Sequence, residues 1–344
     1  MRIGIVIPAF DVALWIGAAI RSVLAQSHAD WRMVVVDDGS RDATAEVVAG
    51  FADPRLRLIR QANAGVSAAR NRALAAVEAD AMLFLDADDW LAPDTLGRLA
   101  AVLAASSEAV VAASCPAAFV PADASGITGG LTPPAGDLLE RLLARNLFAN
   151  GGHVLVRRGA VGAAGGFRAD LAYGEDWALW VRLALLGPFA SVGGPPGLFV
   201  RQRPDSACRR LARDPAAFDR CLDAIFGDPA LAARLGSRLQ MLRRRTEAER
   251  DWIIGRELLR HGRVGVALAC LGRSFAANPS AKRLALLAAA LALPLLPPSR
   301  RGPFAPYPPA ARGFGAASWP PPSAQDARDN PDRIPVTARP KGDD

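Results

Sequence analysis

The chain has 344 residues, which is long for one domain, and 51% of them are hydrophobic, so it can bury a sizeable core. The formal charge of +7 suits a phosphorylated ligand or an anionic membrane surface, whereas nucleic acid is not an expected partner because no RNA-binding signature or zinc-finger spacing accompanies the arginines. The four cysteines form no C-x-x-C pair, which favours buried thiols in a reducing compartment, and no signal peptide is visible.

Strands and helices alternate in the N-terminal part of the chain. Apolar, β-branched runs predict buried strands at residues 2–8, 32–37, 56–59 and 81–86. Helices are predicted at residues 12–25, from the capping Asp42 to about residue 51, and at 67–77. This alternation is typical of a parallel sheet covered on both faces, in which ligands bind beyond the carboxyl ends of the strands. Polar residues stand at three of those ends, at residues 8–11, 37–40 and 86–89.

The rest of the chain is less regular. A strand is predicted at residues 153–157, a helix at 174–186 and a strand at 198–203. Beyond residue 205 the pattern is helical to about residue 293, with a helical hairpin at 247–261 and 263–276. Proline, glycine and polar residues dominate from residue 303 onward and predict disorder. The expected divisions are therefore an α/β domain at residues 1–206, a helical region at 207–297 and a tail at 298–344.

Three acidic residues follow the last of the four N-terminal strands. Asp86, Asp88 and Asp89 are close enough to repel one another, and a divalent cation would remove that conflict. Mg²⁺ commonly takes one or two carboxylates plus the phosphates of a ligand. The alternative is a solvated turn whose acids cap the next helix. The position at a strand end favours the metal site, although Asp89 taken alone fits either interpretation.

Three further segments carry polar groups that have both a functional and a structural interpretation. The acids at residues 37–38 could accept a ring N–H of a base or form an ordinary turn. Arg70 could point into a ligand site or lie on the surface of a packing helix. Glu175 and Asp176 begin a helix, where the dipole stabilises a carboxylate, and on position alone they are better explained as helix-capping residues.

Taken together, these segments resemble the family 2 inverting glycosyltransferases, which have the GT-A fold. The resemblance is carried, in the family's order and spacing, by IVIPAFD at 5–11, VVDDGS at 35–40, NAGVSAARN at 63–71, FLDADD at 84–89 and GED at 174–176. It covers about residues 1–206. It implies a GT-A nucleotide-binding domain with a mostly parallel central sheet, followed by an α-helical appendage.

The resemblance also implies roles for the matching residues. The base of the nucleotide is expected between Pro8 and Phe10 with a hydrogen bond to Asp38, and Arg70 is expected near the base or phosphates. The D-x-D element is expected to be Asp86 and Asp88, with Asp88 in direct contact with Mg²⁺ or Mn²⁺; Asp176 is expected to be the catalytic base, supported by Glu175.

Three residues depart from the family pattern. Phe10 and Asp11 stand where the family usually has tyrosine and asparagine, so a hydroxyl is lost while ring stacking is kept. Arg203 stands where the family often has a histidine, although an arginine could still pair with a diphosphate.

The resemblance predicts a metal-dependent enzyme that transfers a sugar from a nucleotide-sugar, expected to be a UDP-sugar, to a hydroxyl of a glycan or lipid-linked acceptor. Two alternatives remain: a nucleotidyltransferase, which would want a Gly-rich basic loop after the first strand, and a non-catalytic nucleotide-sugar-binding or membrane scaffold protein. The apolar run at residues 284–296 is too short to span a membrane and is either core or an interfacial helix. A cytoplasmic enzyme with peripheral contact to the inner face of the membrane is expected.

Overall fold

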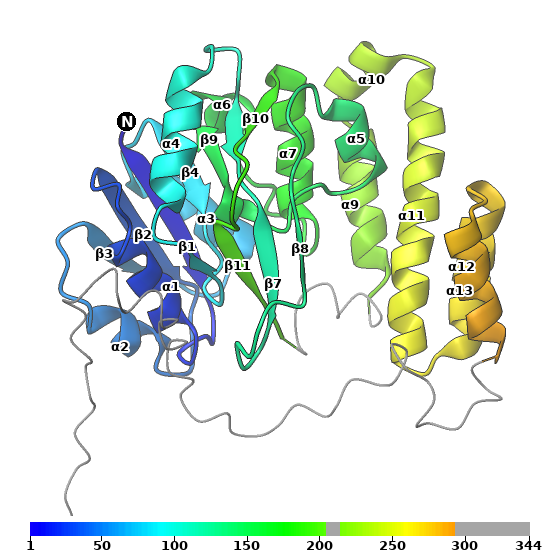
Figure 1. The fold of residues 1–344 in the computed structure, drawn as a ribbon, viewed down its shortest axis with the longest axis horizontal. Coiled ribbons are helices and arrows are strands. Elements are labelled where there is room, and N and C mark those ends of the chain that lie inside the picture. Colours follow the sequence, from blue (N-terminus) through cyan, green and yellow to red (C-terminus); the bar gives the residue numbers. More distant parts are fainter. Residues whose placement is uncertain (204–213, 293–344) are drawn as a thin grey trace, which may run out of the picture. The chain divides into compact units, whose positions relative to one another are not determined.

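The computed structural model describes residues 1–203 and 214–292. Its N-terminal part alternates strands and helices as predicted (Figure 1). The strands are β1 (Ile3–Ala9), β2 (Trp31–Asp37), β3 (Leu56–Arg60) and β4 (Ala81–Phe84). The helices between them are α1 (Ile16–Leu24), α2 (Thr44–Ala49) and α3 (Val66–Ala76). The first two helices are shorter than predicted, and Asp42 accepts hydrogen bonds from the backbone of Ala13 and Thr44 just before α2 begins.

The central sheet has seven strands in the order β10-β6-β9-β4-β1-β2-β3. Its added strands are β6 (Ala112–Ser114), β9 (Val154–Arg157) and β10 (Phe189–Ser191). The pairs β1–β2, β1–β4, β2–β3 and β6–β10 are parallel, whereas β9 runs antiparallel to both β4 and β6. The sheet is therefore mostly parallel, and the predicted α/β fold class is confirmed.

A second, four-stranded sheet was not predicted. It contains β5 (Trp90–Leu91), β7 (Ala117–Pro121), β8 (Gly129–Leu131) and β11 (Leu198–Gln202), in the order β5-β11-β7-β8. The predicted strand at residues 198–203 is therefore real, but it pairs in this smaller sheet.

Both faces of the inner strands β1, β2 and β4 are buried, which explains why these strands are mostly apolar. Ile5 packs with α1 and with Leu99 of α4 (Thr95–Ala105) in one hydrophobic cluster. Its neighbour Val6 points to the other face, because successive side chains of a strand alternate, and packs in the cluster that contains Leu179 of α7 (Glu175–Leu186). The remaining elements of this region are α5 (Leu139–Ala144), α6 (Arg158–Ala163) and the 3₁₀ turn Gly151–His153.

The region beyond residue 213 is helical, as predicted. Its helices are α9 (Ala216–Phe226), α10 (Pro229–Leu235), α11 (Arg238–Arg260), α12 (Val264–Ala277) and α13 (Ala281–Ala292). The predicted hairpin corresponds to α11 and α12, with α11 beginning earlier than expected. The hydrophobic cluster of α7 continues into these helices through Phe218 and Leu258. No helix in the described ranges combines the length and apolar character that crossing a membrane requires.

Several predictions concern residues that the structure does not describe. The predicted domain boundary near residue 206 and the predicted tail lie outside the described ranges, so the divisions stay a prediction. Cys115, Cys221 and Cys270 are free buried thiols, as predicted, whereas Cys208 lies outside the described part of the chain.

Candidate functional site

A cavity of about 610 Å³ opens beyond the carboxyl ends of β1 and β4. Strand ends, the start of α7 and residues of the C-terminal helices all contribute to its lining. Of the predicted site residues, all except Asp38 line this cavity: Pro8, Phe10, Arg70, Asp86, Asp88, Glu175, Asp176 and Arg203. A second hollow of about 590 Å³ shares Pro8, Phe10 and Arg203 with it and is lined by Asp38.

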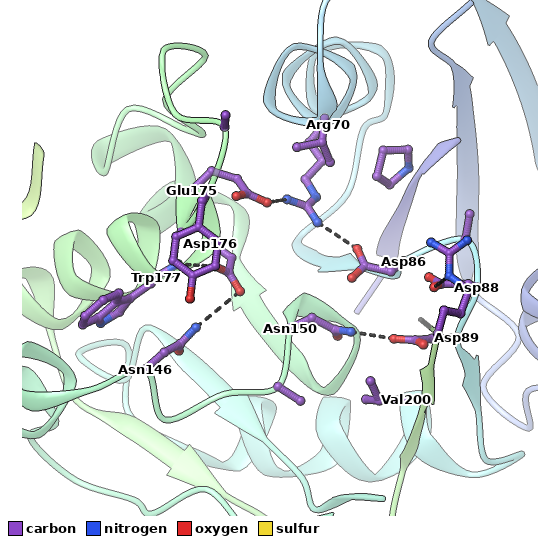
Figure 2. Close-up of a pocket in the computed structure, with 18 of the residues that line it drawn as sticks. Arg70, Asp86, Asp88, Asp89, Asn146, Asn150, Glu175, Asp176, Trp177 and Val200 are labelled. Carbon is purple, nitrogen blue, oxygen red and sulfur yellow. Dashed lines mark hydrogen bonds and ion pairs between the residues drawn. The ribbon is translucent and has the colours of Figure 1, made fainter. Parts of the chain in front are cut away.

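Arg70 links the two acidic motifs of the cavity. Its guanidinium donates to Asp86 at 2.8 Å and to Glu175 at 2.7 Å, as Figure 2 shows. The arginine side chain is only 4% exposed, because it projects from α3 into the space between β4 and α7. Two carboxylates that belong to segments ninety residues apart in sequence are thus held on one cation, which the sequence alone did not show.

Asp86, Asp88 and Asp89 have different surroundings although they share one turn. Asp88 pairs with Arg203 at 2.7 Å and lines the cavity. Asp89 is buried; it accepts hydrogen bonds from the Arg201 amide at 2.8 Å and from Asn150 at 2.6 Å. Asp89 therefore ties the turn to β11 and to the loop before β9, which leaves Asp86 and Asp88 directed at the cavity. Burial raises the pKa of Asp88, and Asp86 adds to this effect while Arg203 opposes it.

The two cavity carboxylates fit a divalent cation that takes further ligands from a bound diphosphate. Within residues 1–203 and 214–292, no group of three or more acidic, histidine or cysteine side chains forms a complete protein cage for a metal. Mg²⁺ does not require one, since it commonly uses one or two carboxylates together with phosphate oxygens and water. The cations that now neutralise Asp86 and Asp88 are Arg70 and Arg203.

Asp176 lies in the first turn of α7 and has no ion-pair partner among the described residues. Its carboxylate accepts a hydrogen bond from the Trp177 amide at 2.6 Å and faces the side-chain amide of Asn146 at 3.5 Å (Figure 2). Burial raises the pKa of Asp176 to about 7, helped by the charge of Glu175 and opposed by Arg70. A carboxyl group with such a pKa can accept a proton near neutral pH.

The second hollow is shaped by Asp38. Its carboxylate is 3% exposed and accepts hydrogen bonds from the amides of Ala64 and Gly65 and from the side chain of Gln61. Gly39, with φ of +78°, lets the chain turn directly after Asp38, and a Cβ there would lie 2.9 Å from the Asn63 amide. Asp38 thus organises the loop before α3, a role that the sequence did not suggest; the predicted hydrogen bond to a base stays a prediction.

Several residues that line the cavity were missed in the sequence. Asn146 precedes no recognisable motif, and Tyr173 stands just outside the GED segment. Phe218, Glu249 and Ile253 come from α9 and α11, far along the chain, where helical periodicity alone cannot separate a cavity-facing position from a packed one.

Comparisons with known proteins agree with this architecture. Residues 4–161 match the family model described as glycosyl transferase family 2. A segment of 109 residues is 38% identical to an uncharacterized glycosyltransferase of Nostoc sp., covering 31% of this chain and 34% of that protein. A segment of 92 residues is 39% identical to the Escherichia coli UDP-Glc:alpha-D-GlcNAc-diphosphoundecaprenol beta-1,3-glucosyltransferase WfgD, covering 26% and 36% of the two chains. The matched segments thus span about a third of these relatives.

Two solved structures show the same fold over most of the chain. One is residues 1–349 of S. aureus TarS in complex with UDP, with a TM-score of 0.54 and 18% identity over 85% of this chain and 87% of that one. The other is the mannosyltransferase PcManGT from Pyrobaculum calidifontis in complex with GDP-Man and Mn²⁺, with a TM-score of 0.55 and 21% identity over 87% and 82%. At these identities the likeness concerns the fold.

Proposed function

We propose that this chain, whose residues 4–161 match glycosyl transferase family 2, is an inverting glycosyltransferase that uses a nucleotide-sugar donor. One observation carries the proposal. A single cavity has the carboxylates Asp86 and Asp88 at a strand end on one side, and the unpaired Asp176 with its raised pKa on the other. Glycosyl transfer needs both of these, a place for a diphosphate leaving group and a base for the acceptor hydroxyl.

The donor is expected to be a UDP-sugar. The TarS structure contains UDP, and the name of the WfgD relative specifies UDP-Glc, whereas the PcManGT structure contains GDP-Man. In this chain the nucleotide would occupy the hollow between Pro8, Phe10 and the loop that Asp38 organises. Phe10 is 42% exposed at its rim and offers a ring face for stacking on a base.

The diphosphate would lie between Asp86, Asp88 and Arg203. A divalent cation held by Asp88 and Asp86 would neutralise charge on the leaving diphosphate. Arg203, which now pairs with Asp88 at 2.7 Å, is placed to donate hydrogen bonds to the same phosphates, in the role expected of the histidine that it replaces. Arg70 would hold Asp86 and Glu175 in position from beneath.

The proton transfer is assigned to Asp176. Its carboxylate would accept the proton of an acceptor hydroxyl as that oxygen attacks C1 of the sugar from the face opposite the leaving group. One displacement of this kind inverts the anomeric centre without a covalent intermediate. Glu175 is engaged by Arg70 and would support Asp176 by position and charge. The acceptor would be a glycan or a lipid-linked sugar.

A donor screen tests the proposal. The full chain is incubated with UDP- and GDP-sugars, with and without Mn²⁺ or Mg²⁺, and with simple glycosides as acceptors. Nucleotide release and transfer that depend on metal, with an inverted product, are expected. If no donor is hydrolysed or transferred under any of these conditions, the enzymatic proposal is wrong and a non-catalytic binding role remains.

A further inference from the structure

One wall of the catalytic cavity comes from the C-terminal helices. Phe218 of α9 and the pair Glu249 and Ile253 of α11 line the same cavity as Asp86 and Asp176. Glu249 and Ile253 are four residues apart, so they share one face of α11. The segment that matches the family model ends at residue 161, and this wall lies entirely beyond it.

Glu249 is held by an ion pair with Arg283, a residue that does not line the cavity. Its Oε2 accepts a hydrogen bond from Arg283 of α13 at 2.6 Å, and Arg283 also donates to Ser274 of α12 at 3.0 Å. Arg283 is 13% exposed and Glu249 28%, so this ion pair is only partly open to water and is screened less by salt than a surface pair. No described residue is hydrogen-bonded to the second carboxylate oxygen, Oε1, which keeps its capacity to accept hydrogen bonds.

Aromatic rings also line this cavity. Tyr173 and Phe218 lie with ring centroids 5.2 Å apart, and Trp177 meets Phe218 edge-on at 5.9 Å. The Trp177 indole is fixed by its hydrogen bond to the Leu142 carbonyl at 2.7 Å. A cavity that offers both rigid apolar surface and a carboxylate suits a ligand that has apolar C–H faces and hydroxyl groups, which is the chemistry of a sugar ring.

We propose that Glu249 binds a hydroxyl group of the acceptor sugar, and that the C-terminal helices thereby form the acceptor-specific wall of the site. This inference rests on the proposed function, because Asp176 fixes where the reacting hydroxyl must be. Glu249 is an unsuitable neighbour for the donor diphosphate, since like charges repel. For the same reason the sugar beside it is neutral and not a uronic acid.

The test compares Glu249→Gln with the matched control Glu247→Gln. Glu247 is on the same helix, is 42% exposed, pairs with Arg243 and does not line the cavity. Both variants are assayed as full chains with the donor and acceptor found in the screen. Glu249→Gln should raise the KM for the acceptor about tenfold, as expected for loss of a charge-assisted hydrogen bond. The KM for the donor and donor hydrolysis should change little, and Glu247→Gln should behave as wild type.

The outcomes separate this inference from the proposed function. An unchanged acceptor KM in Glu249→Gln, with transfer intact, overturns the inference alone, and so does a parallel rise of the donor KM. A wild-type chain without donor turnover overturns the proposed function. Sugar binding at Glu249 is then still tested by the methyl resonance of Ile253, recorded with UDP and Mg²⁺ while methyl glycosides of glucose, N-acetylglucosamine and mannose are added. A shift that weakens in Glu249→Gln supports it, and no shift with any glycoside overturns it.

Discussion

At the scale of single residues, the acidic side chains of the cavity differ in whether an arginine neutralises them. Arg70 neutralises Asp86 and Glu175, and Arg203 neutralises Asp88, so that Asp176 alone among the cavity's predicted acids lacks a cationic partner. Burial raises the pKa of Asp176 to about 7, and the charge of Glu175 adds to this shift while Arg70 opposes it. The arrangement separates the acids that arginines neutralise from the one proposed to exchange a proton.

The pH dependence of transfer should report on Asp176. Because a base must be deprotonated, kcat/KM is expected to fall about tenfold per pH unit below pH 7 and to level off above it. Asp176→Asn should lose about 10²–10⁴-fold in transfer while UDP binding, measured by calorimetry, is kept. The residual activity of the variant should no longer show this pH dependence. Near-normal transfer by Asp176→Asn would move the base elsewhere, with Glu175 the next candidate.

Asp88 and Asp89 share one turn, but substituting Asp88 should affect donor binding whereas substituting Asp89 should affect stability. Asp88→Ala is expected to abolish metal-dependent donor binding without unfolding the chain, because the side chain supports charge in a cavity. Asp89→Ala should instead destabilise the fold by about 1–3 kcal/mol, since it leaves Asn150 and the Arg201 amide without their acceptor. Metal-dependent thermal shift with UDP and urea unfolding distinguish the two. Chelator-insensitive turnover by wild type would contradict the role given to Asp88.

At the scale of elements, the turn before β9 depends on a neutral histidine. His153 is fully buried; its Nε2 accepts from the Ala149 amide at 3.1 Å, so Nδ1 carries the proton that is donated to the Cys115 carbonyl at 2.7 Å. Burial lowers the pKa of His153 to about 4. The uncharged imidazole therefore links the loop around Asn150 to the segment between β6 and β7.

This coupling predicts a pH effect on stability. A histidine whose pKa falls on folding stabilises the protein fully above its unfolded pKa of about 6.5, and the contribution is lost as the pH falls toward 4. Between pH 7 and pH 5 wild type should lose about 2 kcal/mol more unfolding free energy than His153→Gln, measured in urea. Equal losses would show that the ring is not protected from protonation.

The elements with a strong hydrophobic pattern could be predicted from the sequence, whereas the elements with a weak pattern were missed. The strands β1 to β4 are mostly apolar runs, so both their type and their position were predictable. Once the strand ends were predicted, the acidic residues beyond them could be identified as candidate site residues. Strands β6, β8 and β10 have three residues each and are built mainly from alanine, glycine and serine, which carry no strand signal. The cavity residues on α9 and α11 could not be predicted because helix packing, not local sequence, turns them toward Asp176.

At the scale of the molecule, the predicted contact with membranes changes in detail. Of the two basic residues just before the apolar run at residues 284–296, Arg283 pairs with Glu249 inside the helical region. The exposed large hydrophobic residues of α13 are Leu284 and Leu291, which are seven residues apart and share a face. These two side chains are therefore better candidates for an interfacial contact than the arginine.

Liposome sedimentation tests this contact in the full chain. Wild type is expected to sediment with anionic vesicles more than a variant carrying Leu284→Gln and Leu291→Gln, whose core residues Leu286 and Ala290 are untouched. Neutral vesicles serve as the control. Equal, negligible sedimentation of both proteins would remove the membrane claim and leave α13 as an ordinary packing helix.

The hydrophobic cluster that passes from Val6 through Leu179 into Phe218 and Leu258 has a consequence for how the protein melts. A core shared in this way cannot come apart in halves without exposing apolar surface on both, so unfolding should be cooperative across residues 1–292. Calorimetry should show one endotherm instead of two. A chain cut at residue 203 should express as aggregates, and soluble, separately melting halves would show that the shared core is dispensable.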